Sequence, residues 1–86
     1  KAMTLDALKT ADRVIGVKQV GKAVRRGEVV RVYLASDADA RIVEPLRALC
    51  GAQGVPVDEA ATLAQIGAAC GIAVGAAAAA LTRPLG

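Results

Sequence analysis

Tyr33 is the only aromatic residue in a chain of 86 residues, 55% of which are hydrophobic. The hydrophobic core must therefore consist of Val, Ile, Leu and Ala side chains. Such short side chains fill the space between helices and strands only where these elements pack close together. A chain of this length has room for one domain, so we expect residues 1–86 to form a single, closely packed domain.

Hydrophobic periodicity and turn residues predict alternating helices and strands. Thr4 can cap a first helix, and a brief strand at Val14 and Ile15 ends at Gly16. The other predicted helices cover residues 18–26, 41–52 and 63–70. The other predicted strands cover residues 29–35, 55–57 and 76–81.

The last strand is predicted against the helix preference of its alanines. Gly71 and Gly75 interrupt the preceding helix, and too few residues follow for another helix. Helices and strands then alternate along the whole chain. This order predicts the α/β class, in the form of a three-layer α/β/α sandwich with a small mixed four-stranded sheet.

The charge is distributed unevenly along the chain. Residues 1–35 carry eight Lys or Arg and three Asp or Glu, a net charge of +5. Residues 36–86 carry three Lys or Arg and five Asp or Glu, a net charge of −2. A basic first half suggests an anionic partner.

The predicted helix at residues 18–26 is strongly two-sided. At about 100° per residue, Lys18, Lys22 and Arg25 form one stripe, which Gln19 and Arg26 flank. The aliphatic residues fall on the opposite side: Val17, Val20, Ala23 and Val24. Cations on the exposed face can neutralise phosphates, and a Gln amide can pair with a base edge. A solvated surface helix without a ligand is the alternative interpretation.

Gly67, Gly71 and Gly75 recur at every fourth position near the end of the chain. They form neither a Walker motif nor a dinucleotide-binding motif, because the Gly-Lys-Ser/Thr ending and a preceding strand are missing. One interpretation is a tightly packed helix end and turn. The other is an exposed apolar loop that contacts bases displaced from an RNA helix. The loop residues would be Ile72, Ala73 and Val74.

Several classes of function are disfavoured. The chain has no His, and Cys50 and Cys70 lack the spacing of a zinc site, so we expect two buried, reduced thiols of a cytoplasmic protein. Asp37 and Asp39 are spaced like metal ligands but are better explained as a helix cap beside a solvated carboxylate. With no nucleophile and base pair, we expect no enzyme, cofactor or small-molecule substrate. Neither a membrane span nor a signal peptide is apparent.

Three segments, taken in order, resemble a known family. Residues 15–27 (IGVKQVGKAVRRG) and 66–78 (IGAACGIAVGAAA) are similar to signatures of the kink-turn-binding family of the ribosomal protein seven-Ae and thirty-e type. Residues 34–39 (LASDAD) are similar to its Ala-x-Asp-x-Asp/Asn stretch at a strand end. The resemblance covers nearly the whole chain and is closest to the bacterial YbxF and YlxQ branch.

The resemblance implies an α/β/α sandwich that binds kink-turn RNA, a duplex bent sharply at a bulge followed by sheared G·A pairs. It places Gly16 at the tight turn before the helix and Lys22 against guanine or phosphate. The loop would cover bulged nucleotides. The predicted RNA-binding residues are Gly16, Val17, Lys18, Gln19, Lys22, Arg25, Arg26, Ile72, Ala73 and Val74.

One departure from the family affects base recognition. Lys18 and Gln19 stand where archaeal relatives carry Asn-Glu. A Gln offers one acceptor and one donor group where a Glu accepts twice, so the resemblance implies weaker and more salt-dependent binding. We expect a monomer that binds ribosomal or regulatory RNA, with the ribosome as a possible partner. The alternative is a protein-interaction or ribosome-assembly module that docks through residues 72–75.

Overall fold

The computed structural model describes Leu8 and residues 12–82. Its elements are β1 (Arg13–Ile15), α2 (Val17–Arg25), β2 (Val29–Leu34), α3 (Ala40–Gln53), β3 (Val57–Asp58), α4 (Leu63–Ala69) and β4 (Ala78–Thr82). The predicted helix that begins at Thr4 lies outside the described residues, except for Leu8, which is helical and buried. The other predicted elements are all present, with ends that differ by at most two residues.

The four strands form one mixed sheet in the order β1-β4-β2-β3. Strand β4 is antiparallel to both β1 and β2, and β3 is parallel to β2. Strands β1, β2 and β3 therefore point the same way, and each is followed by a helix. As a result α2, α3 and α4 all begin at the same edge of the sheet, which we call the carboxyl edge.

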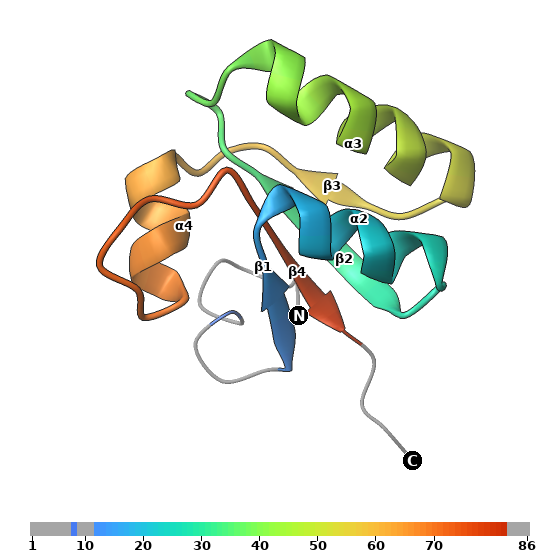
Figure 1. Cartoon of the computed structure of the whole chain (residues 1–86), viewed down its shortest axis with the longest axis horizontal. Helices are drawn as coiled ribbons and strands as arrows, with labels where there is room; N and C mark the ends of the chain where they lie inside the picture. The colour runs from blue at the N-terminus through green and yellow to red at the C-terminus, as the bar shows by residue number, and fades with distance from the viewer. Residues whose placement is uncertain (1–7, 9–11, 83–86) are drawn as a thin grey trace.

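Helices cover both faces of this sheet (Figure 1). Successive strand residues point to opposite faces, and the buried residues divide accordingly into two clusters. The cluster on the α2 and α3 side includes Val32, Leu34, Ala78 and Ala80. The cluster on the α4 side includes Tyr33, Ala79, Leu81 and Leu8. The predicted three-layer α/β/α sandwich is confirmed.

The alanine-rich strand β4 lies in the interior of the sheet. Ala78, Ala79 and Ala80 are fully buried, and β4 pairs with a strand on each side. Pairing on both edges and packing on both faces outweigh the helix preference of Ala. The small side chains let α2 on one face and α4 on the other lie close to the sheet. The predicted strand is confirmed.

Side chains cap helices α3 and α4. The Asp39 carboxylate accepts a hydrogen bond from the Arg41 backbone N–H at 2.9 Å at the start of α3. Thr62 and Gln65 form a reciprocal capping box at the start of α4. Asp37 Oδ1 accepts from the Leu63 backbone N–H at 2.7 Å. Asp39 is thus the expected helix cap, and Asp37, expected as a solvated carboxylate, is exposed and also accepts a hydrogen bond at the start of α4.

None of the helices in the described part of the chain has both the length and the apolar character needed to cross a bilayer.

Candidate nucleic-acid interface

Helix α2 buries one side and exposes the other, as its periodicity predicts. Its buried residues are Val20, Gly21, Ala23 and Val24. Its exposed residues are Lys18, Gln19, Lys22 and Arg25, and Arg26 is exposed just past the end. Val17 is partly buried and packs against the core on the α3 side. The helix therefore presents a polar, basic face that its own packing does not use.

The start of α2 is built differently from the starts of α3 and α4. Gly16 occupies the cap position with φ +100°, in the left-handed range that L residues rarely adopt. It has no side chain with which to accept from the first-turn N–H groups, unlike Asp39 and Thr62. Free N–H groups and the positive end of the helix dipole favour an anion at this point. The backbone of a ligand can also approach Gly16 closely.

The basic residues of α2 differ from those of α3 in their partners. Arg41 pairs with Asp39 at 2.8 Å, and Arg47 pairs with Glu59 at 2.6 Å and with Glu44. These hydrogen bonds raise the pKa of Arg47 and lower the pKa values of Asp39 and Glu59. Within residues 12–82, no carboxylate pairs with Lys18, Lys22, Arg25 or Arg26. Four cations without a described ion-pair partner thus lie together on α2 and just past its end.

The apolar loop and the start of α2 lie at the same edge of the sheet. The Gly16 N–H donates to the Ala78 carbonyl at 2.9 Å, and the Ala35 N–H donates to the Ala77 carbonyl at 2.9 Å. These bonds place the beginning of β4, and the loop that leads into it, at the carboxyl edge. Figure 1 shows this loop turning back from the end of α4 toward the start of α2. The two predicted segments are therefore brought together.

The recurring glycines pack α4 against the loop. A Cβ atom on Gly67 would lie 2.1 Å from the Val74 carbonyl oxygen, and one on Gly75 would lie 3.0 Å from the Leu63 Cβ atom. Gly71 ends the helix with φ +77°. The interpretation of these glycines as a tightly packed helix end and turn is confirmed. It does not exclude an exposed loop, because the loop backbone packs on α4 while side chains can point outward.

The three loop residues do not share one environment. Val74 is 69% exposed and Ala73 is exposed, but Ile72 is partly buried and packs against the core cluster on the α4 side. Ile72 was expected to lie with them on the exposed surface, and it instead helps to hold the loop in place. The exposed apolar surface of the loop is therefore formed by Ala73 and Val74.

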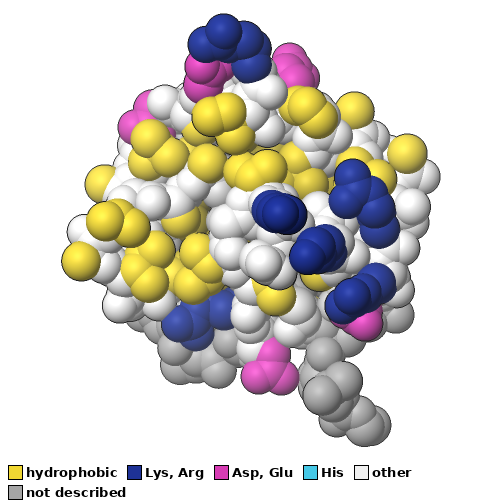
Figure 2. Space-filling view, in the orientation of Figure 1, with side chains coloured by type: hydrophobic (Ala, Val, Ile, Leu, Met, Phe, Trp, Pro, Cys, Tyr) yellow, Lys and Arg dark blue, Asp and Glu magenta, His cyan; other side chains and the backbone are white. Residues whose placement is uncertain are grey.

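Figure 2 shows how these features lie on one face of the molecule. Basic side chains gather over α2, and hydrophobic side chains gather over α4 and its loop and along the boundary between α2 and α3. A basic surface beside an exposed apolar surface suits a partner that offers both phosphates and unstacked bases.

One part of this face, a groove between α2 and α3, was not predicted from the sequence. A groove of about 300 Å³ separates α2 from α3, and Ile42 on its α3 side is 48% exposed. Ile42, Pro45 and Leu49 follow the i, i+3, i+7 spacing of one helix stripe. This spacing was the available signal, but an apolar stripe on a helix ordinarily indicates core packing.

This chain is similar to known proteins in both sequence and fold. Residues 2–85 match the family model described as the Ribosomal protein L7Ae/L30e/S12e/Gadd45 family. The RNA-binding protein YbxF of Geobacillus stearothermophilus is 41% identical over 76 residues, which cover 88% of this chain and 93% of that protein. An RNA-binding protein of Halalkalibacterium halodurans is 39% identical over 75 residues, which cover 87% of this chain and 92% of that protein.

Two solved structures have closely similar folds. The Giardia lamblia 15.5kD RNA binding protein matches with a TM-score of 0.85 and 29% identity, over 93% of this chain and 71% of that chain. A protein with unknown function from Bacillus halodurans matches with a TM-score of 0.84 and 29% identity, over 96% and 87% of the two chains. The resemblance inferred from three sequence segments is confirmed by these matches, and the chain belongs to the ribosomal protein L7Ae/L30e/S12e/Gadd45 family.

Proposed function

We propose that this protein binds RNA, and that its target is the kink-turn. The observation that carries the proposal is that the start of α2 and the apolar loop lie together at the carboxyl edge. The start of α2, whose cations have no described ion-pair partner, and the loop with the exposed Ala73 and Val74 are joined at this edge through the Gly16–Ala78 hydrogen bond. Relatives that cover most of the chain are named RNA-binding proteins, which supports RNA as the partner. The family and these relatives indicate a binding protein and not an enzyme.

In this proposal the phosphate backbone is bound by α2. A phosphate that approaches over Gly16 accepts from the first-turn N–H groups of α2. Lys18 and Lys22, on the exposed face of the helix, bind the neighbouring phosphates. Arg25 and Arg26 extend the positive charge toward the end of the helix. Each phosphate that these cations neutralise releases counterions, so the affinity must fall as salt rises.

Base recognition is assigned to two other contacts. The exposed Gln19 amide can donate to and accept from the edge of a guanine in the sheared G·A pairs. Ala73 and Val74 cover the nucleotides of the adjacent bulge, where unstacked bases offer flat apolar faces. The competing function, a protein-assembly module docking through residues 72–75, has less surface available because Ile72 is partly buried against the core.

A titration with two RNAs tests the proposal. A labelled kink-turn RNA and the same RNA without the sheared G·A pairs are titrated at two salt concentrations. We expect the kink-turn to bind about tenfold more tightly, the scale of one or two lost base-edge contacts. The difference should persist as salt weakens both complexes. Equal Kd values for the two RNAs at both salt concentrations would contradict kink-turn recognition.

The double variant Gln19→Ala/Lys22→Ala tests the residue assignment. We expect it to weaken kink-turn binding by about tenfold or more, through one lost base contact and one lost phosphate contact. Arg47→Gln is the charge-matched control, because it also removes one positive charge but lies on α3 in an ion pair with Glu59. Similar losses for both proteins would show that overall charge, and not the α2 face, determines binding.

A further inference from the structure

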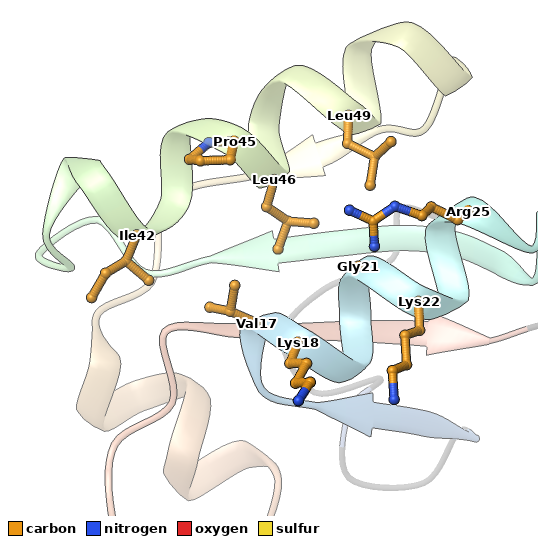
Figure 3. Close-up of a pocket in the computed structure, with 9 residues that line it drawn as sticks. All are labelled: Val17, Lys18, Gly21, Lys22, Arg25, Ile42, Pro45, Leu46 and Leu49. Carbon is orange, nitrogen blue, oxygen red and sulfur yellow. The ribbon is translucent and has the colours of Figure 1, made fainter.

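The groove between α2 and α3 has an aliphatic wall and a basic rim. Its floor and α3 wall are formed by Val17, Ile42, Pro45, Leu46 and Leu49. Lys18, Gly21, Lys22 and Arg25 line the α2 side. Figure 3 shows the aliphatic side chains of α3 and Val17 directed toward the space between the two helices. Neither helix fills this space with its own side chains.

The three cations of the groove do not point the same way (Figure 3). Lys18 and Lys22 point away from α3, toward the exposed face assigned to RNA, whereas Arg25 folds back over its own helix toward Leu49. The guanidinium lies over Gly21, where a Cβ atom would be 3.4 Å from one of its terminal nitrogens. A guanidinium without an ion pair to any described carboxylate thus lies beside an aliphatic wall.

This combination favours a flat, partly apolar group that carries a negative charge. A guanidinium is planar, so a nucleic-acid base can stack on it, and it also pairs with phosphate. The only aromatic residue, Tyr33, is buried, so a base on this surface has no aromatic side chain on which to stack. Arg25 and the α3 wall provide the alternative, in a space of about 300 Å³.

We propose that the α2–α3 groove holds one unpaired nucleotide that flanks the RNA segment bound by the exposed face of α2. Its base lies between the Arg25 guanidinium and the α3 wall, and its phosphate lies toward Lys22. The groove shares Lys18 and Lys22 with the exposed face of α2, so a strand leaving that face enters the groove without crossing neutral surface. This inference rests on the proposed RNA binding but not on the kink-turn.

Two RNAs with the same base-paired core test the inference. One ends blunt, and the other carries three unpaired nucleotides at each end. We expect the unpaired nucleotides to tighten binding by the wild-type protein about tenfold, the scale of one base on a protein surface. Ile42→Glu should abolish this gain, because it places a carboxylate in the groove. Ala48→Glu is the matched control on the exposed side of α3 and should keep the gain.

A second pair of variants tests the guanidinium. Arg25→Gln and Arg26→Gln remove the same charge from neighbouring positions, but only Arg25 lines the groove. We expect both variants to bind the blunt RNA more weakly than the wild type does. Only Arg25→Gln should reduce the gain in affinity that the unpaired nucleotides provide. In parallel, the methyl NMR signals of Ile42 and Leu49 should shift more with the extended RNA than with the blunt RNA.

Three outcomes of the RNA comparison would overturn the inference. The wild-type protein could show no gain, Ile42→Glu could keep the whole gain, or Ile42→Glu and Ala48→Glu could lose it equally. The inference would also be overturned if a protein partner required Ile42 for binding while the gain in RNA affinity did not. The groove would then be assigned to that partner. Failure of kink-turn selectivity alone leaves this comparison intact, because both RNAs share one core and differ only in their unpaired ends.

Discussion

Gly67 of α4 lies so close to the main chain of Val74 that a Cβ atom on Gly67 would be 2.1 Å from the Val74 carbonyl oxygen. Cβ atoms do not approach an oxygen this closely, so helix and loop can keep their contact only while residue 67 has no side chain. The contact sets the position of the exposed Val74 side chain relative to α4. A packing requirement in the helix thus determines the geometry of a surface proposed to contact RNA.

Replacing this glycine should therefore affect both stability and binding. In Gly67→Ala the added methyl group meets backbone, which cannot rotate away. We expect the free energy of unfolding to fall by about 1–3 kcal/mol, as is typical of overpacking. The loop should shift, and RNA affinity should fall with it. Urea denaturation and an RNA titration at a temperature where the variant is folded measure the two effects separately.

Gly21→Ala provides the matched control in a second helix. A Cβ atom on Gly21 would lie 3.4 Å from a terminal nitrogen of Arg25, the mobile end of a long side chain. The side chain can move, and Ala is about 1 kcal/mol more favourable than Gly inside a helix. We expect Gly21→Ala to be as stable as the wild type or more so. If both variants were equally destabilised, loss of glycine itself, and not the contact with Val74, would be the cause.

The loop residues Ile72 and Val74 should separate stability from binding. Val74 is 69% exposed, so Val74→Ser should leave the free energy of unfolding within about 0.5 kcal/mol of wild type. It should nevertheless weaken RNA binding, because the bulged bases lose apolar contact. Ile72 packs on the core, so Ile72→Ser should lower stability by about 1–2 kcal/mol. Thermal unfolding and RNA titration of both variants measure the two effects. A Val74→Ser variant that lost stability but kept its RNA affinity would contradict the role given to Val74.

The ion pair between Arg47 and Glu59 should make stability depend on pH. Hydrogen bonds from Arg47 at 2.6 and 3.0 Å hold the pKa of Glu59 below its ordinary value of 4.5. A carboxyl whose pKa is lower in the folded state stabilises the fold above its unfolded pKa, and this contribution disappears as pH falls through the folded pKa. We therefore expect the free energy of unfolding to fall between about pH 5 and pH 3.

Glu59→Gln isolates this contribution. Its stability should depend less on pH in that range than the stability of the wild type does, as denaturation at several pH values would measure. Both side chains of the pair are more than one third exposed, at 37% for Arg47 and 41% for Glu59. The difference should therefore be small and should shrink further in high salt. Identical pH profiles at low salt would contradict a stabilising pair.

The two cysteines should be unreactive while the protein is folded. Cys50 is fully buried and Cys70 is 3% exposed, and both are free thiols. Burial raises the pKa of both thiols, and for Cys70 it outweighs the opposite effect of Arg13. Thiolates are the reactive species, so a disulfide reagent at neutral pH should modify neither residue until denaturant is added. Rapid labelling of either thiol in the native protein would contradict this placement.

Local sequence was enough to predict α2 and the helix starts. A two-sided helix is determined by residues three and four positions apart, and the caps at Asp39 and Thr62 act within their own first turns. These interactions involve neighbours along the chain, so their pattern is visible in consecutive residues. The basic face of α2 was predictable for the same reason. The strand of alanines was predictable only by exclusion, since its burial depends on its place within the sheet.

The chain order of residues thus determined the elements, their inner and outer faces, and the two segments proposed to contact RNA. Tertiary structure alone decided that Ile72 packs partly on the core while Val74 is exposed, and that Gly67 is required by the backbone of a loop seven residues away. It also decided that Arg25 turns toward α3 and leaves a groove there. These features arise where segments that fold separately come into contact. The distances between them depend on the strand order and on how closely the helices pack against the sheet, which no local pattern encodes.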